Sequence, residues 1–123
     1  MILVDTSVWV DHFGVGDPHL VRLLDRGETL GHPWVTGELA LGQLRGRAEV
    51  LRLLEHLPQA TVATAAELLQ FINGRELSGL GIGYVDAQLL ASTMLTEGRL
   101  WTRDRRLRSV AERVGALYAH EPG

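Results

Sequence analysis

The chain has 123 residues, of which 46% are hydrophobic and 22% are charged, the balance of one ordinary globular domain. Cysteine is absent, which excludes disulfides, thiol nucleophiles and cysteine-based zinc sites. Lysine is absent too, so all 12 Lys/Arg positions are arginine, and Schiff-base, Walker A and Ser–Lys chemistry are excluded. The formal net charge of −3 disfavours a protein that coats nucleic acid in general.

The amino-terminal residues 1–4 are apolar, but Asp5 follows at once and no basic segment precedes them. This pattern predicts neither a secretory signal nor a membrane span. We therefore expect a single cytoplasmic domain over residues 1–123.

Strands and helices are predicted to alternate along the whole chain. Apolar and β-branched runs predict strands at residues 2–4, 29–36, 60–63, 100–102 and 116–119. Apolar periodicity predicts helices at residues 6–13, 18–26, 37–43, 47–57, 65–74, 84–97 and 105–114. This alternation predicts an α/β fold: a three-layer α/β/α sandwich with a central parallel sheet and right-handed crossovers.

Local signals support several of the helix boundaries. Asp17 before Pro18 is a strong helix start, and Thr64 with Glu67 three residues later forms a capping box. The three glycines within residues 78–83 predict a loop before the helix at 84–97. That helix is apolar nearly all round, so we expect it to be buried.

Four acidic residues are placed near the carboxyl edge of the predicted sheet. Asp5 and Asp104 follow predicted strands, Glu38 lies two residues beyond another, and Asp86 lies in the first turn of the helix after the glycine loop. Ligands of such sheets bind at the carboxyl ends of the strands, so these side chains are expected at one edge. Clustered carboxylates repel each other unless a cation neutralises them. Oxygen ligands without cysteine favour Mg²⁺ or Mn²⁺ over zinc, and such ions suit phosphodiester chemistry.

Each of these acids has a simpler explanation when taken alone. Asp5 is placed to cap the following helix, and Glu38 and Asp86 to complement helix amino-termini. Asp104 fits an ordinary turn. However, the surroundings of Asp86 are apolar, where an unpaired carboxylate is costly. The coincidence of all four at one predicted edge favours a functional site.

Four segments, in this order, resemble a known family: MILVDTSVW at residues 1–9, TGEL at 36–39, YVDA at 84–87 and LWTRD at 100–104. Over essentially its whole length the chain resembles PIN-domain endoribonucleases, specifically the VapC-type toxins of bacterial toxin–antitoxin pairs. The resemblance implies a sheet of order 3-2-1-4-5, and one or two Mg²⁺ or Mn²⁺ ions. It also implies hydrolysis of single-stranded or looped RNA by metal-activated water. The implied partners are a second copy in a homodimer and a VapB-like antitoxin, whose carboxy-terminal segment inserts at the active site.

The resemblance also assigns roles to particular residues. Asp5 and Asp86 match the principal metal ligands, and Asp104 matches a third that binds directly or through water. Glu38 matches the remaining acid, which orients water or holds a second ion. Thr102 and then Thr6 are the strongest matches to hydroxyl groups near the metal, with Ser7 behind them.

Arginines gather near the carboxy-terminus, where residues 99–113 hold six arginines against two acidic residues. Arg103, Arg105 and Arg106 are therefore candidates for contacts with RNA phosphates. The same segment also fits a solvated helix face or an antitoxin contact. The five histidines lack ligand spacing and are expected in surface or capping roles, and the three tryptophans in the core or a dimer interface.

Two other classes of enzyme or signalling domain are excluded by residues next to Asp5. A receiver domain needs an acidic pair there and a lysine after the last strand, but Thr6 follows Asp5 and lysine is absent. A haloacid-dehalogenase-type phosphatase needs a second aspartate where Ser7 stands. The remaining alternative is a catalytically inactive PIN-like module that binds RNA or protein without turnover.

Overall fold

A computed structural model describes residues 1–120, so residues 121–123 of the predicted domain lie outside the described residues. The strands and helices, in chain order, are β1 Ile2–Val4, α1 Thr6–Val15, α2 Pro18–Asp25, β2 Thr29–Leu30, α3 Pro33–Leu41, α4 Arg47–His56, α5 Ala65–Gly74, α6 Tyr84–Thr96, β3 Arg99–Trp101 and α7 Arg105–Arg113. The predicted α/β fold is confirmed, but the alternation is incomplete, because α3, α4, α5 and α6 follow one another without a strand between them.

The sheet is parallel and has the strand order β2-β1-β3. Ile2 of β1 is paired with Thr29 on one side and with Arg99 on the other. Single parallel bridges extend the sheet at both edges, between Gly31 and Gln59 and between Leu100 and Leu117. With these bridges included, the order along the sheet is the segment at Gln59, β2, β1, β3 and the segment at Leu117. Numbered along the chain, this is the expected order 3-2-1-4-5.

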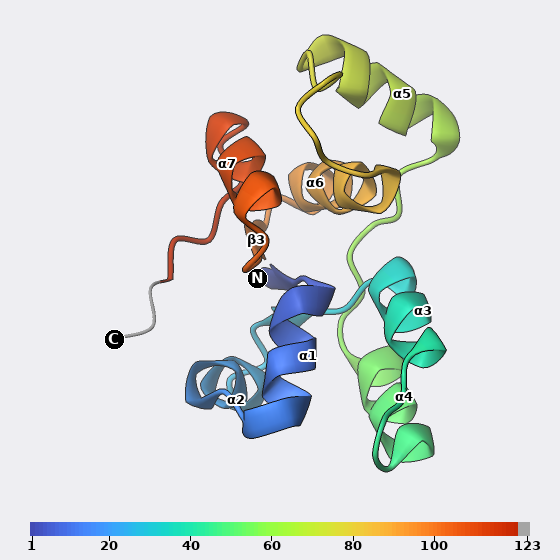
Figure 1. Cartoon of the computed structure of the whole chain (residues 1–123), viewed down its shortest axis with the longest axis vertical. Helices are drawn as coiled ribbons and strands as arrows, with labels where there is room; N and C mark the ends of the chain where they lie inside the picture. Colours follow the sequence, from blue (N-terminus) through green and yellow to red (C-terminus); the bar gives the residue numbers. More distant parts are fainter. Residues whose placement is uncertain (121–123) are drawn as a thin grey trace.

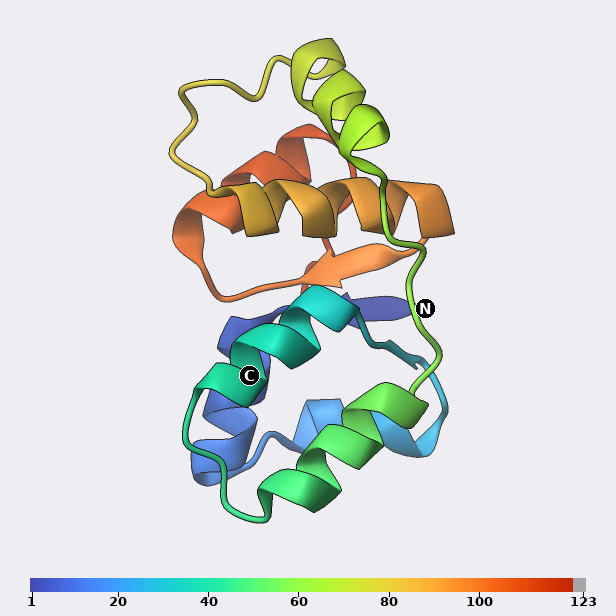
Figure 2. The same ribbon diagram turned by 90° about the vertical axis from the view of Figure 1, so that its right-hand side faces the viewer.

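Helices cover both faces of the sheet. Figures 1 and 2 both show α1 to α4 on one side of the strands and α5 to α7 on the other, which is the expected three-layer arrangement. In Figure 2 the arrowhead of β3 and the amino end of α6 lie on the same side. The carboxyl ends of the strands therefore face the same way as the start of the helix that carries Asp86.

The prediction of a strand over residues 29–36 is wrong beyond Leu30. Helix α3 already begins at Pro33, because His32 caps it: the imidazole Nδ1 accepts a hydrogen bond from the Trp34 backbone N–H at 3.0 Å. Pro33 at the first helical position has the φ that a helix needs. The predicted start of this helix at residue 37 was therefore four residues late.

Neither predicted edge strand forms: residues 60–63 contain no strand, with a single bridge just before them at Gln59, and residues 116–119 are reduced to one bridge at Leu117. Ala63 forms both of its backbone hydrogen bonds with the side chain of Gln88 instead of a neighbouring strand. At the other edge, the Leu100 N–H donates to the Ala116 carbonyl and the Leu100 carbonyl accepts from the Tyr118 N–H, which makes one bridge. Neither segment forms a strand of regular length.

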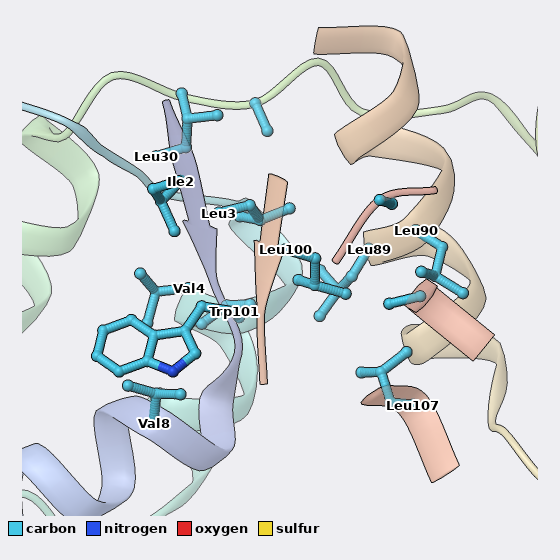
Figure 3. Packing of buried hydrophobic residues seen from close by; sticks show 14 of the residues in the cluster. Ile2, Leu3, Val4, Val8, Leu30, Leu89, Leu90, Leu100, Trp101 and Leu107 are labelled. Carbon is cyan, nitrogen blue, oxygen red and sulfur yellow. The ribbon is translucent and has the colours of Figure 1, made fainter. Parts of the chain in front are cut away.

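The core lies between the sheet and both helical layers. Figure 3 shows side chains of β1 and β3 packed against those of α1, α6 and α7. Trp9 and Trp101 are almost fully buried, at 1% and 2% exposure, so two of the three tryptophans are core residues as expected. Within residues 1–120, no helix has both the length and the apolar character needed to cross a bilayer.

Gly98, between α6 and β3, has no room for a side chain. A Cβ there would lie 2.9 Å from the carbonyl oxygen of Met1, which also accepts the Arg99 N–H bond at 3.1 Å. We expect Gly98→Ala to force β1 and β3 apart and to lower the free energy of unfolding by about 1–3 kcal/mol in urea titrations. Gly14→Ala is the control: it meets nothing within 4 Å in α1 and is expected to stabilise by about 0.5–1 kcal/mol. Equal stability of Gly98→Ala and the wild type would contradict this account.

Candidate functional site

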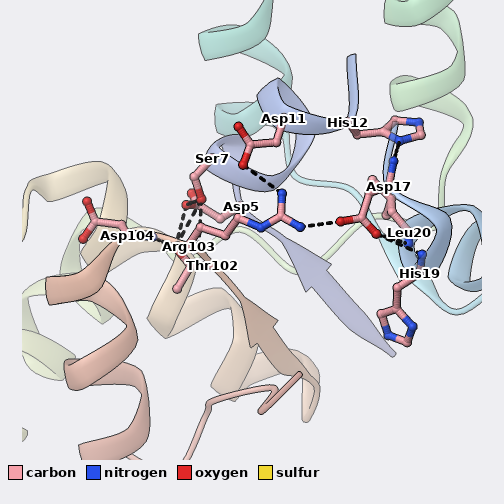
Figure 4. Close-up of polar contacts among 10 residues, drawn as sticks. All are labelled: Asp5, Ser7, Asp11, His12, Asp17, His19, Leu20, Thr102, Arg103 and Asp104. Atoms are coloured by element: carbon pink, nitrogen blue, oxygen red, sulfur yellow. Dashed lines mark hydrogen bonds and ion pairs between the residues drawn. The ribbon is translucent and has the colours of Figure 1, made fainter. Parts of the chain in front are cut away.

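Asp5 ends β1, and its carboxylate is held from two sides. Its Oδ2 accepts hydrogen bonds from Ser7 Oγ at 2.7 Å and from Thr102 Oγ1 at 2.8 Å (Figure 4). Although Asp5 occupies the N-cap position of α1, its side chain forms no capping hydrogen bond. It is also buried, with 6% of its surface exposed. The simple explanation of Asp5 as a helix cap is therefore wrong.

The turn after β3 orients these two hydroxyl groups. Ser7 Oγ accepts a hydrogen bond from the Arg103 backbone N–H, and Thr102 Oγ1 accepts one from the Asp104 backbone N–H, both at 3.0 Å. Because each hydroxyl oxygen already accepts a backbone N–H, its own proton is free to be donated to Asp5. Ser7 contacts Asp5 as directly as Thr102 does, although the sequence favoured Thr102 and Thr6.

Glu38 lies on α3 and is linked to α1. Its Oε1 accepts a hydrogen bond from Thr6 Oγ1 at 2.8 Å. Because α3 begins at Pro33, Glu38 is not in the first turn, so it is not a helix-start glutamate. Thr6 thus contacts Glu38 and not Asp5.

Asp86 and Asp104 each use one carboxylate oxygen at a helix start. Asp86 Oδ2 accepts from the Gly83 N–H at 3.1 Å, and Asp104 Oδ1 accepts from the Leu107 N–H at 2.9 Å. The capping explanation is therefore correct for one oxygen of each residue. Among residues 1–120, no hydrogen-bond donor reaches the second oxygen of either carboxylate.

The charges of the four acids act on one another. Burial raises the pKa of Asp86 above its ordinary value, and the nearby charges of Asp5, Asp104 and Glu38 raise it further, while the Gly83 hydrogen bond opposes the rise. Within the described chain, none of the four forms an ion pair with an arginine or histidine. The edge of the sheet therefore carries uncompensated negative charge.

The donor set fits a hard divalent cation. It consists of carboxylate and hydroxyl oxygens only, which favours Mg²⁺ or Mn²⁺. In residues 1–120, no three His, Cys, Asp or Glu side chains are close enough to ligate one ion together. Mg²⁺ commonly binds through one or two carboxylates and keeps several waters, so this wider spacing suits a hydrated ion.

The three candidate arginines lie in different environments. Arg103 pairs with Asp11 at 2.9 Å and with Asp17, so its guanidinium turns away from Asp104 (Figure 4). Arg106 lies against the loop before α6, where a Cβ on Gly81 would be 2.8 Å from its Nη1. Arg105 is exposed at the start of α7.

Two features near the acids were missed from the sequence. One is the full burial of His32, which has a capping role, as expected for the histidines, but no surface exposure. The other is a cleft of about 720 Å³ between α1, α3 and the loop that follows α3; its lining includes Thr6, Phe13, Glu38, Leu44 and Arg45. The cleft is lined by segments far apart in sequence, so no local sequence pattern predicts it.

Removing the charge of Asp86 should stabilise the metal-free protein. Its pKa is raised above 3.8, so the folded state binds the proton more tightly and stability falls as pH rises through the folded pKa. In Asp86→Asn the amide oxygen still accepts from Gly83, but the repulsion is gone. We expect a higher Tm than wild type in EDTA at neutral pH, with the difference shrinking towards about pH 4. A lower Tm for the variant at neutral pH would contradict the proposed repulsion.

Comparison with known proteins agrees with this geometry. Residues 2–113 match the family described as PIN domain. The chain is 48% identical over 122 residues to Ribonuclease VapC32 of Mycobacterium tuberculosis, in strains CDC 1551 / Oshkosh and ATCC 25618 / H37Rv, and the alignment covers 98% of each chain. The chain therefore belongs to the PIN-domain family, within its VapC group.

Proposed function

We propose that the protein is a Mg²⁺- or Mn²⁺-dependent endoribonuclease, the toxin of a VapBC-type toxin–antitoxin pair. The observation that carries this proposal is the set of mutually repelling carboxylates at the carboxyl edge of the sheet, with Asp86 affected by the other three. Membership of the VapC group supports the choice of RNA as substrate. The proposed unit is a single domain of residues 1–123 that acts in the cytoplasm.

The proposed roles follow from the contacts of each carboxylate. Asp5, Asp86 and Asp104 hold the ion directly or through water, each with one oxygen already held by the protein. Glu38, oriented by Thr6, holds or directs the attacking water. The ion, when bound, lowers the pKa of water and stabilises charge on phosphate oxygens.

The antitoxin is proposed to bind over the cleft between α1 and α3. The lining of the cleft includes Thr6 and Glu38, the apolar side chains of Phe13 and Leu44, and Arg45. A peptide segment in this cleft would cover Glu38 and exclude RNA from the acids. We also propose a homodimer, on the basis of the family.

The alternative is a PIN-like module that binds RNA or protein without turnover. Such a module has no use for carboxylates that repel one another, because binding alone does not need a cation at this position. The two functions are separated by a cleavage assay.

Purified protein is expected to cleave RNA in Mg²⁺ or Mn²⁺ and not in EDTA, as followed by gel electrophoresis of total RNA. Asp5→Asn should reduce the rate by more than the roughly 10–100-fold typical of residues that act through a metal ligand. Thr102→Val, which loses one hydrogen bond to Asp5, should fall within that smaller range. If wild type and Asp5→Asn leave RNA equally intact in both metals, the protein is not a nuclease of this kind.

Arg105 and Arg106 are expected to contact RNA phosphates beside the acids. Replacing both with alanine in the Asp5→Asn background should weaken RNA binding. It should also reduce the slope of log K against log salt by about 0.7 for each lost phosphate contact. The control replaces two other exposed arginines with alanine: Arg22 in α2 and Arg26, the C-cap of that helix. An unchanged slope in the Arg105/Arg106 variant, or an equal loss in the control, would assign the α7 arginines elsewhere.

A further inference from the structure

The buried imidazole of His32 links the two helices that carry Glu38 and Asp86. His32 caps α3, and its Nε2 lies 2.9 Å from Ser92 Oγ on α6. Both side chains have 0% exposure. In Figure 2, α6 runs above β3 and α3 runs below it. Among the hydrogen bonds of residues 1–120, only this one joins α3 or its cap to α6.

The neighbouring hydrogen bonds determine where the protons are. Ser92 Oγ donates to Gln88 Oε1 at 2.7 Å, so its oxygen is left to accept from His32 Nε2–H. The other ring nitrogen, Nδ1, already accepts from the Trp34 N–H. The imidazole is therefore neutral, protonated on Nε2, and uses both nitrogens.

The α6 end of this link is itself held in place. Gln88 Oε1 accepts from the Ala63 N–H at 2.9 Å, and Gln88 Nε2 donates to the Ala63 carbonyl at 3.0 Å. Ser92, Gln88 and Ala63 thus form one buried chain of hydrogen bonds. A satisfied buried network of this kind favours one arrangement of the elements it joins.

We propose that His32 is a positioning residue for the acidic cluster: through Ser92 it sets the separation between Glu38 on α3 and Asp86 on α6. The inference rests on the proposed metal-dependent function. Capping of α3 uses only Nδ1 of His32. The second, fully buried hydrogen bond, from Nε2 to Ser92 on α6, is therefore not explained by capping. A ring contact also joins the two helices, between Trp34 and Tyr84, whose centroids are 5.8 Å apart. Tyr84 is 57% exposed and constrains the helices less.

Two substitutions separate the cap from the link. In His32→Asn the amide oxygen replaces Nδ1 as the cap, but the side chain is too short to reach Ser92. In His32→Gln the amide nitrogen replaces Nε2 and reaches Ser92, while the cap is lost. Ser92→Ala breaks the link from the other end and leaves the cap intact.

Mn²⁺ binding to the protein without RNA, measured by isothermal titration calorimetry, is the first measurement. We expect His32→Asn and Ser92→Ala to weaken Mn²⁺ binding roughly 10–100-fold and to raise the Mn²⁺ concentration for half-maximal cleavage, with the KM for RNA at saturating Mn²⁺ little changed. His32→Gln should restore Mn²⁺ affinity towards the wild-type value even though it destabilises the fold.

Thr93→Val is the matched control. Thr93 is also fully buried on α6, and its hydroxyl donates only within the helix, to the Leu89 carbonyl at 2.7 Å. The variant loses one buried hydrogen bond without touching α3, so it should lose stability and keep its Mn²⁺ affinity.

A second measurement does not depend on metal binding. The backbone amide chemical shifts of Glu38 and Asp86 in metal-free protein should change in His32→Asn and Ser92→Ala and stay near wild type in Thr93→Val. The proposal is overturned if His32→Asn behaves like Thr93→Val in both measurements. If the wild type neither binds Mn²⁺ nor cleaves RNA, the proposed function fails, and the amide shifts still decide whether His32 positions the two acids.

Discussion

The parallel pairing of β1 with β3 is the constraint on which the site depends. It places the end of β1, at Asp5, next to the turn that follows Trp101, and the Asp5 N–H bonds to the Trp101 carbonyl at 2.9 Å. Two backbone N–H groups of that turn occupy the lone pairs of Ser7 and Thr102, whose hydroxyls then bond to Asp5. Strand register, hydroxyl orientation and carboxylate orientation are therefore successive consequences of one pairing. A one-residue slip would move Thr102 to the other face of the strand.

The arrangement of arginines preserves the negative charge of this edge. Arg103 is adjacent to Asp104 in sequence and would neutralise the cluster if it turned inward. Instead it pairs with Asp11 and Asp17 on the other side, and its guanidinium stacks over Trp101 at 5.5 Å. These two ion pairs and the aromatic contact hold the Arg103 guanidinium away from the acids. This leaves the negative charge that the proposed divalent cation would neutralise.

The sequence places Asp5, Asp86 and Asp104 on their elements because that part of the fold follows from local rules. A short apolar strand followed by Asp5 needs only period and composition, and the capping box at Thr64 and the bond from the Gly83 N–H to Asp86 each join residues only three positions apart. The strand predicted over 29–36 failed because Trp34 and Val35 favour strands locally, whereas His32, an unusual helix cap, and Pro33 start a helix there. The edge strand at 60–63 failed because its hydrogen bonds go to a side chain 25 residues away. Neither His32 nor Gln88 carries a signal in sequence, since their partners are brought to them only by the packed fold.

The same electrostatics bear on the choice between an enzyme and a binding module. RNA phosphates are anionic, so four carboxylates at the proposed phosphate position would repel the substrate as they repel one another. In the proposed function, exposed arginines such as Arg105, at the start of α7, would attract the RNA backbone nearby, but they do not cancel charge at Asp5, which is 6% exposed. In the proposed function, a divalent cation held by the acids would change this repulsion into attraction at the position where hydrolysis needs it. Substrate binding and catalysis at this edge would then depend on the same ion, which a module that only binds RNA would have no reason to require.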